Sequence, residues 1–168
     1  GGSVEGFAEL MNQKAKELGC VQTCFVTPNG LDAAGHQTTA AELGRIAAYA
    51  AKDEIFRKII GTRSYDFSNT EGKNYHADNA DAFLDQMEGA FGIKTGFTGE
   101  AGYCFVGALE DNGRTFISVV LGSGWPPNKN YKWEDTRKLM EYGLEAYTLV
   151  HVGEDNMPLG QMAVTNGV

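Results

Sequence analysis

Three apolar runs joined by very short connections constrain the fold of this chain more than any other feature of its sequence. They are "GIKTGF" at 92–97, "YCFVGAL" at 103–109 and "RTFISVVLG" at 114–122. A glycine-rich turn at 99–102 joins the first two runs, and Asp-Asn-Gly at 111–113 joins the second pair. Connections this short predict three neighbouring strands in an antiparallel meander.

Helical patterns lie on both sides of these strands. The spacing of apolar residues predicts helices over 3–18, from Thr39 onward, over 53–60 and from about 133 to 147. Ser3 is the candidate N-cap of the first helix, and Thr39 with Glu42 fits a capping box. Helices that flank an antiparallel sheet make the expected fold class α+β.

Two further patterns complete the expected architecture. Tyr65 and Phe67 alternate with polar residues ahead of a Glu71-Gly72 turn, which predicts a small hairpin. The last helix is expected to turn one apolar face inward, made of Leu139, Met140, Gly143, Leu144 and Tyr147. We expect residues 1–149 to form part of one domain and the strand-like tail at 150–168 to begin a β-rich one.

Composition and charge exclude several classes of function. With 168 residues, 42% of them hydrophobic and 21% charged, the chain is long enough for a packed core. Its net charge of −8 and the lack of a basic stripe argue against nucleic acid as a partner. No apolar run approaches the roughly 20 residues of a spanning helix, and no basic-plus-apolar signal opens the sequence, so no membrane contact is expected.

The three cysteines do not decide the redox compartment. Cys20, Cys24 and Cys104 cannot all pair within one chain, and the first two lack the second ligand pair of a structural zinc site. Buried free thiols are the favoured interpretation. A Cys20–Cys24 disulfide and a metal site stay open as alternatives.

The run at 92–97 carries the candidate chemistry. Lys94 and Thr95 lie among small residues, with glycines at positions 92, 96, 99 and 102. So little side chain leaves the strand backbone open to an extended peptide, which can add a strand to the sheet. The alternative is a solvated edge strand that lysine guards against aggregation. Lys94 and Thr95 point to opposite faces of a regular strand, so one ligand meets both only at a twist or at the strand's edge.

The order of several motifs resembles the low-molecular-weight penicillin-binding proteins, the serine-type D-alanyl-D-alanine carboxypeptidases. The likeness runs through "GFAELMNQKAKELG", "TPNGLDAAGHQTTAAELG", "GIKTGFTGEAGYC" and "DTRKLMEYGL". Members of that family carry S-x-x-K, then S-x-N, then K-T-G on a sheet strand. The resemblance implies a partial penicillin-binding, β-lactamase-like transpeptidase fold, with residues 1–149 as the C-terminal part of the catalytic domain.

The resemblance also implies roles for the K-T-G strand. Lys94 would present its ammonium to the active serines and to the substrate carboxylate, and Thr95 would hydrogen-bond that carboxylate. Gly96 keeps the approach clear. The strand after it, through Thr98, would pair with the peptide backbone, and the Phe97 N–H would be one oxyanion-hole donor. Where the family often has a carboxylate-binding arginine, this chain has Lys132, with Arg137 one turn further on; lysine lacks the bidentate geometry.

Neither S-x-x-K nor S-x-N occurs in this chain. Its serines are Ser3, Ser64, Ser68, Ser118 and Ser123, and none has lysine three positions or asparagine two positions later. We therefore expect the nucleophile and its general base in an upstream half of the same domain, outside these residues. That missing half would be a partner of this segment, and the segment alone is expected to be inactive.

The family's reaction is acyl transfer from a stem peptide of peptidoglycan to serine, followed by hydrolysis. Membership implies no metal and no organic cofactor, β-lactam antibiotics as further ligands, and a site of action outside the cytoplasmic membrane. Two alternatives share the K-T-G strand: a β-lactamase-like hydrolase of the same superfamily, and a noncatalytic module that binds peptidoglycan peptides.

Other candidate residues have structural interpretations. His36 is expected to serve in a turn, and His76 and His151 have no partners at metal-ligand spacing. Three acidic residues, Asp78, Asp81 and Asp85, are expected to be solvated carboxylates at the start of a helix. A loop with Trp125, Pro126 and Pro127 either rims a cleft or packs on its neighbours.

Overall fold

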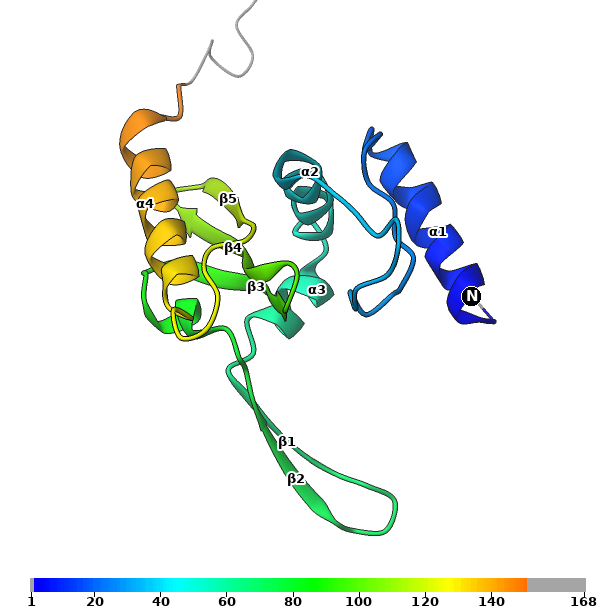
Figure 1. Cartoon of the computed structure of the whole chain (residues 1–168). Coiled ribbons are helices and arrows are strands. Elements are labelled where there is room, and N and C mark those ends of the chain that lie inside the picture. Colours follow the sequence, from blue (N-terminus) through cyan, green and yellow to red (C-terminus); the bar gives the residue numbers. More distant parts are fainter. Residues whose placement is uncertain (1, 151–168) are drawn as a thin grey trace, which may run out of the picture.

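The computed structural model describes residues 2–150, which form a three-stranded sheet with helices on both faces and a projecting hairpin (Figure 1). The elements in chain order are α1 (Val4–Glu17), α2 (Ala40–Ala50), α3 (Glu54–Ile60), β1 (Ser64–Ser68), β2 (Asn74–Asp78), the 3-10 helix η1 (Ala82–Asp85), β3 (Ala90–Thr98), β4 (Gly102–Asp111), β5 (Arg114–Val120) and α4 (Tyr131–Ala146). The α+β class is confirmed. The expected start of a second domain at 150–168 lies outside the described residues, apart from its first residue.

The helix starts match the predicted caps. Ser3 accepts a hydrogen bond from the Gly6 N–H, and Thr39 accepts one from the Glu42 N–H. The Glu42 side chain does not close the capping box. It is buried and accepts hydrogen bonds from the Val21 and Gln22 N–H groups, so it fixes the loop after α1.

The sheet has the predicted meander, in the order β3-β4-β5, with both pairs antiparallel. The register places Lys94, Val106 and Val119 in one cross-strand row. Val119 packs under α2, because a Cβ added to Gly44 of that helix would lie 3.8 Å from Val119 Cγ2. The next row contains Thr95 and Phe105. Residues opposite each other share a face, so adjacent rows face α2 and α4 respectively.

The main core lies between the sheet and α4. Its buried members are Phe83, Phe105, Leu109, Val120 and Met140. Phe105 is the centre of an aromatic cluster, with edge-on contacts to Phe83 at 5.7 Å and to Trp133 at 4.7 Å between ring centroids. This cluster holds η1 and the start of α4 against β4.

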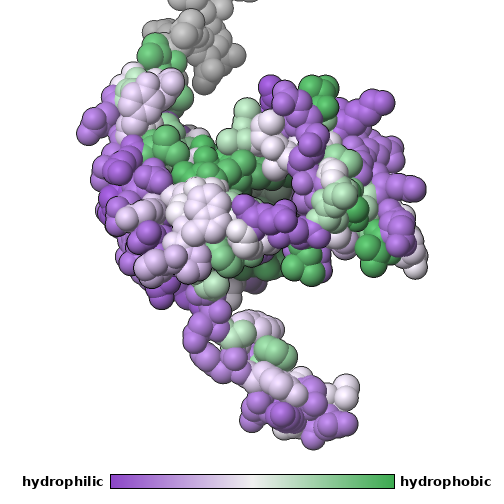
Figure 2. Space-filling view, viewed as in Figure 1, coloured by the Kyte–Doolittle hydropathy of each residue, from purple (hydrophilic) through white to green (hydrophobic). Residues whose placement is uncertain are grey.

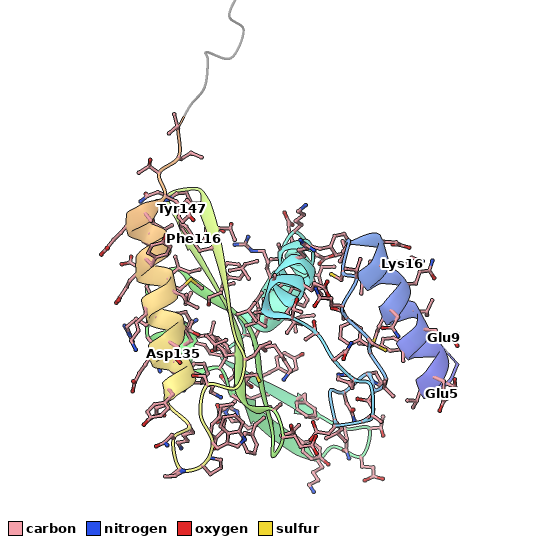
Figure 3. All side chains as sticks on the ribbon, turned by 45° about the horizontal axis from the view of Figure 1, so that its top comes forward. Glu5, Glu9, Lys16, Phe116, Asp135 and Tyr147 are labelled. Carbon is pink, nitrogen blue, oxygen red and sulfur yellow. The ribbon has the colours of Figure 1, made fainter. Side chains whose placement is uncertain are left out.

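The inward face of α4 is narrower than its apolar pattern predicts. Met140 and Gly143 are buried, but Leu139 is 46% exposed and Tyr147 is 59% exposed. The Phe116 ring fills the space beside Gly143 (Figure 3). A Cβ added to Gly143 would lie 2.9 Å from that ring. Leu139 and Tyr147 instead border an apolar groove of about 410 Å³ between α4 and α2, alongside β5. Figure 2 shows hydrophobic surface gathered there.

The predicted hairpin, β1 and β2, projects from the body and exposes every residue (Figure 1). Tyr65, Phe67 and Tyr75 stack on one another, with centroids 6.2 and 5.2 Å apart. His76 lies between two carboxylates, with Nδ1 2.7 Å from Asp66 and Nε2 3.0 Å from Asp78. Cross-strand contacts of this kind hold together a hairpin that has no core of its own.

The cysteines are free thiols, as favoured from the sequence, but they are not all buried. Cys20 is buried, Cys24 is exposed and Cys104 is partly buried. Cys24 is exposed because it lies in a surface loop, where it pairs through its backbone with Gln37. Among residues 2–150 no helix is long and apolar enough to cross a membrane, and no group of acidic, histidine or cysteine side chains has the geometry to hold a metal ion.

Candidate functional site

The K-T-G residues lie on β3, which is an edge strand in the part of the chain that the structure describes. Lys94 and Gly96 are exposed, and Thr95 is half-buried. The cross-strand rows put Lys94 on the α2 face and Thr95 on the α4 face, as their adjacent positions predict. The strand thus offers an open backbone edge with an ammonium on one side and a hydroxyl on the other.

The side chains at the two ends of this segment already have partners. The Lys94 ammonium donates a hydrogen bond to the carbonyl oxygen of Thr95, at 2.6 Å. The Thr98 hydroxyl donates to Asp32 at 2.9 Å and accepts from the Ala101 N–H at 3.0 Å. Thr98 therefore fixes the end of β3 and connects it to the loop between α1 and α2. The Lys94 side chain is held at the strand by the carbonyl group of the next residue.

Lys132 lies in the first turn of α4 and is only 9% exposed. Its ammonium is over the ring of Tyr103, 5.3 Å from the centroid, and over that of Trp133 at 4.5 Å. Tyr103 is the cross-strand partner of Phe97, with centroids 4.5 Å apart. Lys132 is therefore placed on the same face of the sheet as Thr95.

Burial and nearby charges act on the Lys132 ammonium. Burial lowers the pKa of Lys132, and the positive charge of Lys94 is among the smaller effects that lower it further. The Lys94 ammonium thus lies on one face of this edge strand, and the Lys132 ammonium lies on the other face, over the Tyr103 ring of the neighbouring strand. Such an arrangement suits a ligand that presents a carboxylate and an extended backbone.

Arg137 does not contribute to this cation pair. Its guanidinium donates to the backbone carbonyl and to the side chain of Gln86, at 3.2 and 3.4 Å. It therefore joins α4 to the end of η1. Of the two cations that the sequence offered in place of the family's arginine, Lys132 is the one that approaches β3.

The turn after β3 is covered by the loop that follows β5. The Trp125 indole N–H donates to the carbonyl oxygen of Gly99 at 2.9 Å, while about half of the side chain stays exposed. A Ser123 hydroxyl bonded to Asp135 at 2.6 Å joins the same loop to α4. Trp125 therefore both packs on the turn and borders the open end of the strand.

Of the other candidates, three have the predicted turn position or exposure and one does not. His36 serves in a turn, where its Nδ1 accepts from the Val26 N–H at 3.1 Å. Asp78 and Asp85 are exposed as predicted, but Asp78 is the last residue of β2 and does not lie at the start of a helix. Asp81 is not solvated: it is only 4% exposed, because it caps η1 at the place where Phe83 enters the core. His151 lies outside the described residues.

Comparison with known proteins decides the family. A model of the D-alanyl-D-alanine carboxypeptidase family matches residues 1–124 of the 168. This chain belongs to the D-alanyl-D-alanine carboxypeptidase family. The family resemblance drawn from the order of its motifs is thereby confirmed.

Individual relatives agree. The chain is 32% identical over 167 residues to D-alanyl-D-alanine carboxypeptidase DacF of Bacillus subtilis, which covers 99% of this chain and 42% of that protein. It is 33% identical over 145 residues to the enzyme of Streptomyces sp. strain K15, covering 83% and 49%. The chain thus spans about half or less of the length of these curated relatives.

Solved structures show the same fold. A variant of the Streptomyces K15 DD-transpeptidase superposes with a TM-score of 0.78 at 32% identity, over 84% of this chain and 55% of that one. Penicillin-binding protein D2 from Listeria monocytogenes, in a cefotaxime-bound form, gives a TM-score of 0.71 at 32% identity, over 83% and 55%. The expected penicillin-binding, transpeptidase-like fold is therefore confirmed for this part of the domain.

Sequence reasoning missed Tyr103 and assigned the wrong environment to Asp81. Tyr103 supplies the ring beneath the Lys132 ammonium, and its place opposite Phe97 follows from the strand register. Asp81 supplies a buried carboxylate. The apolar pair Phe83-Leu84, two residues after it, was the available signal, because a capping residue bonded to the backbone of a core residue is buried with that residue.

Proposed function

We propose that this chain supplies the substrate-binding strand of a serine-type D-alanyl-D-alanine carboxypeptidase, which removes the terminal D-alanine from stem peptides of peptidoglycan. The observation that carries the proposal is the unpaired edge of β3, with the Lys94 ammonium on one face of the strand and the Thr95 hydroxyl on the other. Because the chain belongs to the D-alanyl-D-alanine carboxypeptidase family, we propose a stem peptide that ends in D-alanine as the ligand of this edge. The proposal concerns the activity of the whole protein, of which these residues are one part.

Each residue of the strand has a proposed role. Lys94 and Thr95 bind the carboxylate of the terminal D-alanine, and Lys94 also faces the active serines. The backbone from Gly96 to Thr98 pairs with the peptide as an added strand. The Phe97 N–H donates to the developing oxyanion. Lys132 adds positive charge on the Thr95 side, as a point charge without the bidentate geometry of arginine.

The proposed reaction is acyl transfer in two steps. The serine Oγ attacks the penultimate carbonyl carbon while a lysine takes the hydroxyl proton. The C–N bond then breaks, and D-alanine leaves with a proton on its nitrogen. Water hydrolyses the resulting ester and regenerates the serine. Because no S-x-x-K or S-x-N motif occurs among the 168 residues, we place the nucleophile and its base on a segment other than these.

Exposed apolar surfaces support a second segment as partner. On α1, Val4, Phe7 and Leu10 are 56, 47 and 53% exposed and share one side of the helix. The groove between α4 and α2 exposes further apolar surface beside the free edge of β5 (Figure 2). Surfaces of this kind mark interfaces. We propose that an N-terminal half of the same domain covers them, and that residues 1–149 and 150–168 belong to successive domains.

β-Lactam antibiotics are proposed as further ligands of the same strand, since the Listeria relative was solved in a cefotaxime-bound form. The site of action is proposed to be outside the cytoplasmic membrane, where peptidoglycan is built and where this family serves cell-wall biogenesis and cell shape. No metal or organic cofactor enters the proposed mechanism.

One experiment separates this function from its two alternatives. The chain is co-expressed with a polypeptide that carries the S-x-x-K and S-x-N segments, and the purified complex is assayed with diacetyl-L-lysyl-D-alanyl-D-alanine. Release of D-alanine supports the carboxypeptidase. Turnover of penicillin without that release would assign a β-lactamase, and peptide binding without either reaction would leave a noncatalytic binding module.

A further inference from the structure

Two buried charged side chains on the α4 face of the sheet have no ion-pair partner within 4 Å among the described residues. Asp81 is 4% exposed; its Oδ1 accepts from the Phe83 N–H at 3.0 Å, and its Oδ2 has no hydrogen-bond partner among the described residues. Lys132 is 9% exposed and rests on aromatic rings. Buried charges without partners are costly, so each of these groups depends on the nearest opposite charge.

The aromatic cluster around Phe105 brings the two groups near each other. Phe83 and Trp133 both pack edge-on against that ring. Asp81 caps the backbone N–H of Phe83, and Lys132 directly precedes Trp133. The carboxylate and the ammonium therefore both border this aromatic cluster, and they are too far apart for a hydrogen bond to Asp81 Oδ2.

The electrostatic effects run in both directions. Burial lowers the pKa of Lys132, and the charge of Asp81 is the largest effect that opposes this. Burial raises the pKa of Asp81 to about 6, and the Phe83 N–H and then Lys132 oppose that rise. The other groups that act on the pair are Cys104, which raises the pKa of Lys132, Lys129 and Lys94, which lower it, and Asp85, which raises the pKa of Asp81.

We propose that Asp81 is the counter-charge of Lys132, a positioning residue that keeps this buried ammonium protonated beside the K-T-G strand. Burial favours the neutral form of a lysine, which cannot attract a carboxylate, and a nearby anion opposes this effect. The proposal rests on the proposed function in one respect, namely that Lys132 serves as a carboxylate anchor. The coupling between the two side chains does not depend on that function.

The test follows the titration of Lys132 in the full chain by NMR, using lysine labelled with ¹³C at Cε, and the signal is assigned by its loss in Lys132→Arg. Asp81→Asn removes the charge and keeps an oxygen to cap Phe83. It is expected to lower the titration midpoint of Lys132. Asp85→Asn is the matched control, because Asp85 is exposed and paired with Arg63, and it should leave the midpoint in place. An unchanged midpoint in Asp81→Asn would overturn the proposal.

The reciprocal variant guards against a folding artefact. Lys132→Met should raise the titration midpoint of Asp81, followed through its ¹³C carboxyl signal. The two shifts should be equal in size, because coupling between two sites is reciprocal. A shift in one direction without the other would also overturn the proposal, since a rearranged fold and not the pair would then be its cause.

A peptide arm separates this proposal from the proposed function. Affinity for diacetyl-L-lysyl-D-alanyl-D-alanine is measured against pH, with the C-terminal amide of the peptide as control. In Asp81→Asn the alkaline loss of carboxylate affinity should move to lower pH. At a pH between the Lys132 titration midpoints of the wild type and of Asp81→Asn, the affinity of the variant for the peptide carboxylate should be roughly three- to tenfold lower than that of the wild type. If the wild-type chain binds neither peptide, the proposed function fails for this chain, and the two titrations still decide the role of Asp81.

Discussion

The Trp125 indole lies so close to Gly102 that a Cβ on this glycine would be 2.8 Å from the ring carbon Cε2. Gly102 also has a φ of +70°, which favours glycine. Gly102→Ala is therefore expected to destabilise the chain by about 1–3 kcal/mol, measured by urea unfolding. Gly99→Ala, in the same turn, has open space around its Cβ and no positive φ. Equal losses in the two variants would contradict this packing.

The isolated chain is expected to form no acyl adduct with labelled penicillin, because no serine in it has the S-x-x-K context. The measurement is fluorescent penicillin labelling followed by denaturing electrophoresis and intact-mass analysis. A full-length family member processed in parallel shows that the reagent is active. A stoichiometric covalent adduct on this chain would disprove the placement of the nucleophile elsewhere.

His76 should make the stability of the hairpin depend on pH. Its hydrogen bonds to Asp66 and then Asp78 raise its pKa above the ordinary 6.5. Because the folded-state pKa is raised, the stabilisation is fully present below about pH 6.5 and is lost as pH rises through the folded-state pKa. NMR titration of the imidazole and hydrogen exchange of β1 and β2 measure it. His76→Gln should remove the pH dependence of exchange; its persistence would assign the effect to another group.

Glu42 should stabilise the chain against acid. The hydroxyl of Thr23, and then the Gln22 and Val21 N–H groups, hold the pKa of this carboxylate below its usual value. A lowered pKa gives stability that is present above about pH 4.5 and lost as pH falls through the folded-state pKa. Glu42→Gln should lower the melting temperature at pH 7 by several degrees and flatten its decline in acid. Glu9→Gln, on α1 (Figure 3), is the exposed control and should change neither.

Local patterns were sufficient to predict most of the fold. The caps at Ser3 and Thr39, the hairpin and the meander depend on residues within a few positions of one another, so short-range spacing predicts them. The place of Lys94 and Thr95 on opposite faces followed from strand alternation alone. The width of the inward face of α4 was overestimated, because the helical repeat shows which residues share a side of the helix and not where the underlying sheet ends.

Long-range relationships at the site could not be predicted in this way. The contact of Lys132 with Tyr103 joins α4 to β4, and the burial of Asp81 depends on Phe83 entering a core that strand and helix build together. The Glu42 side chain accepts hydrogen bonds from N–H groups of the loop after α1 and does not cap its own helix, because those N–H groups have no other acceptor in the part of the chain that the structure describes. Each of these outcomes depends on tertiary packing and not on local sequence.

The most direct test of the central claim is an NMR titration of the ¹⁵N-labelled chain with diacetyl-L-lysyl-D-alanyl-D-alanine. Shifts are expected in the amide signals of residues 95–98, and none are expected with the C-terminal amide of the peptide. Lys94→Ala should weaken binding roughly tenfold or more, the value of a charge-assisted hydrogen bond. Lys73→Ala removes an exposed lysine on the hairpin and should bind as wild type. Undiminished binding by Lys94→Ala, or shifts confined to other elements, would contradict the assignment of this strand.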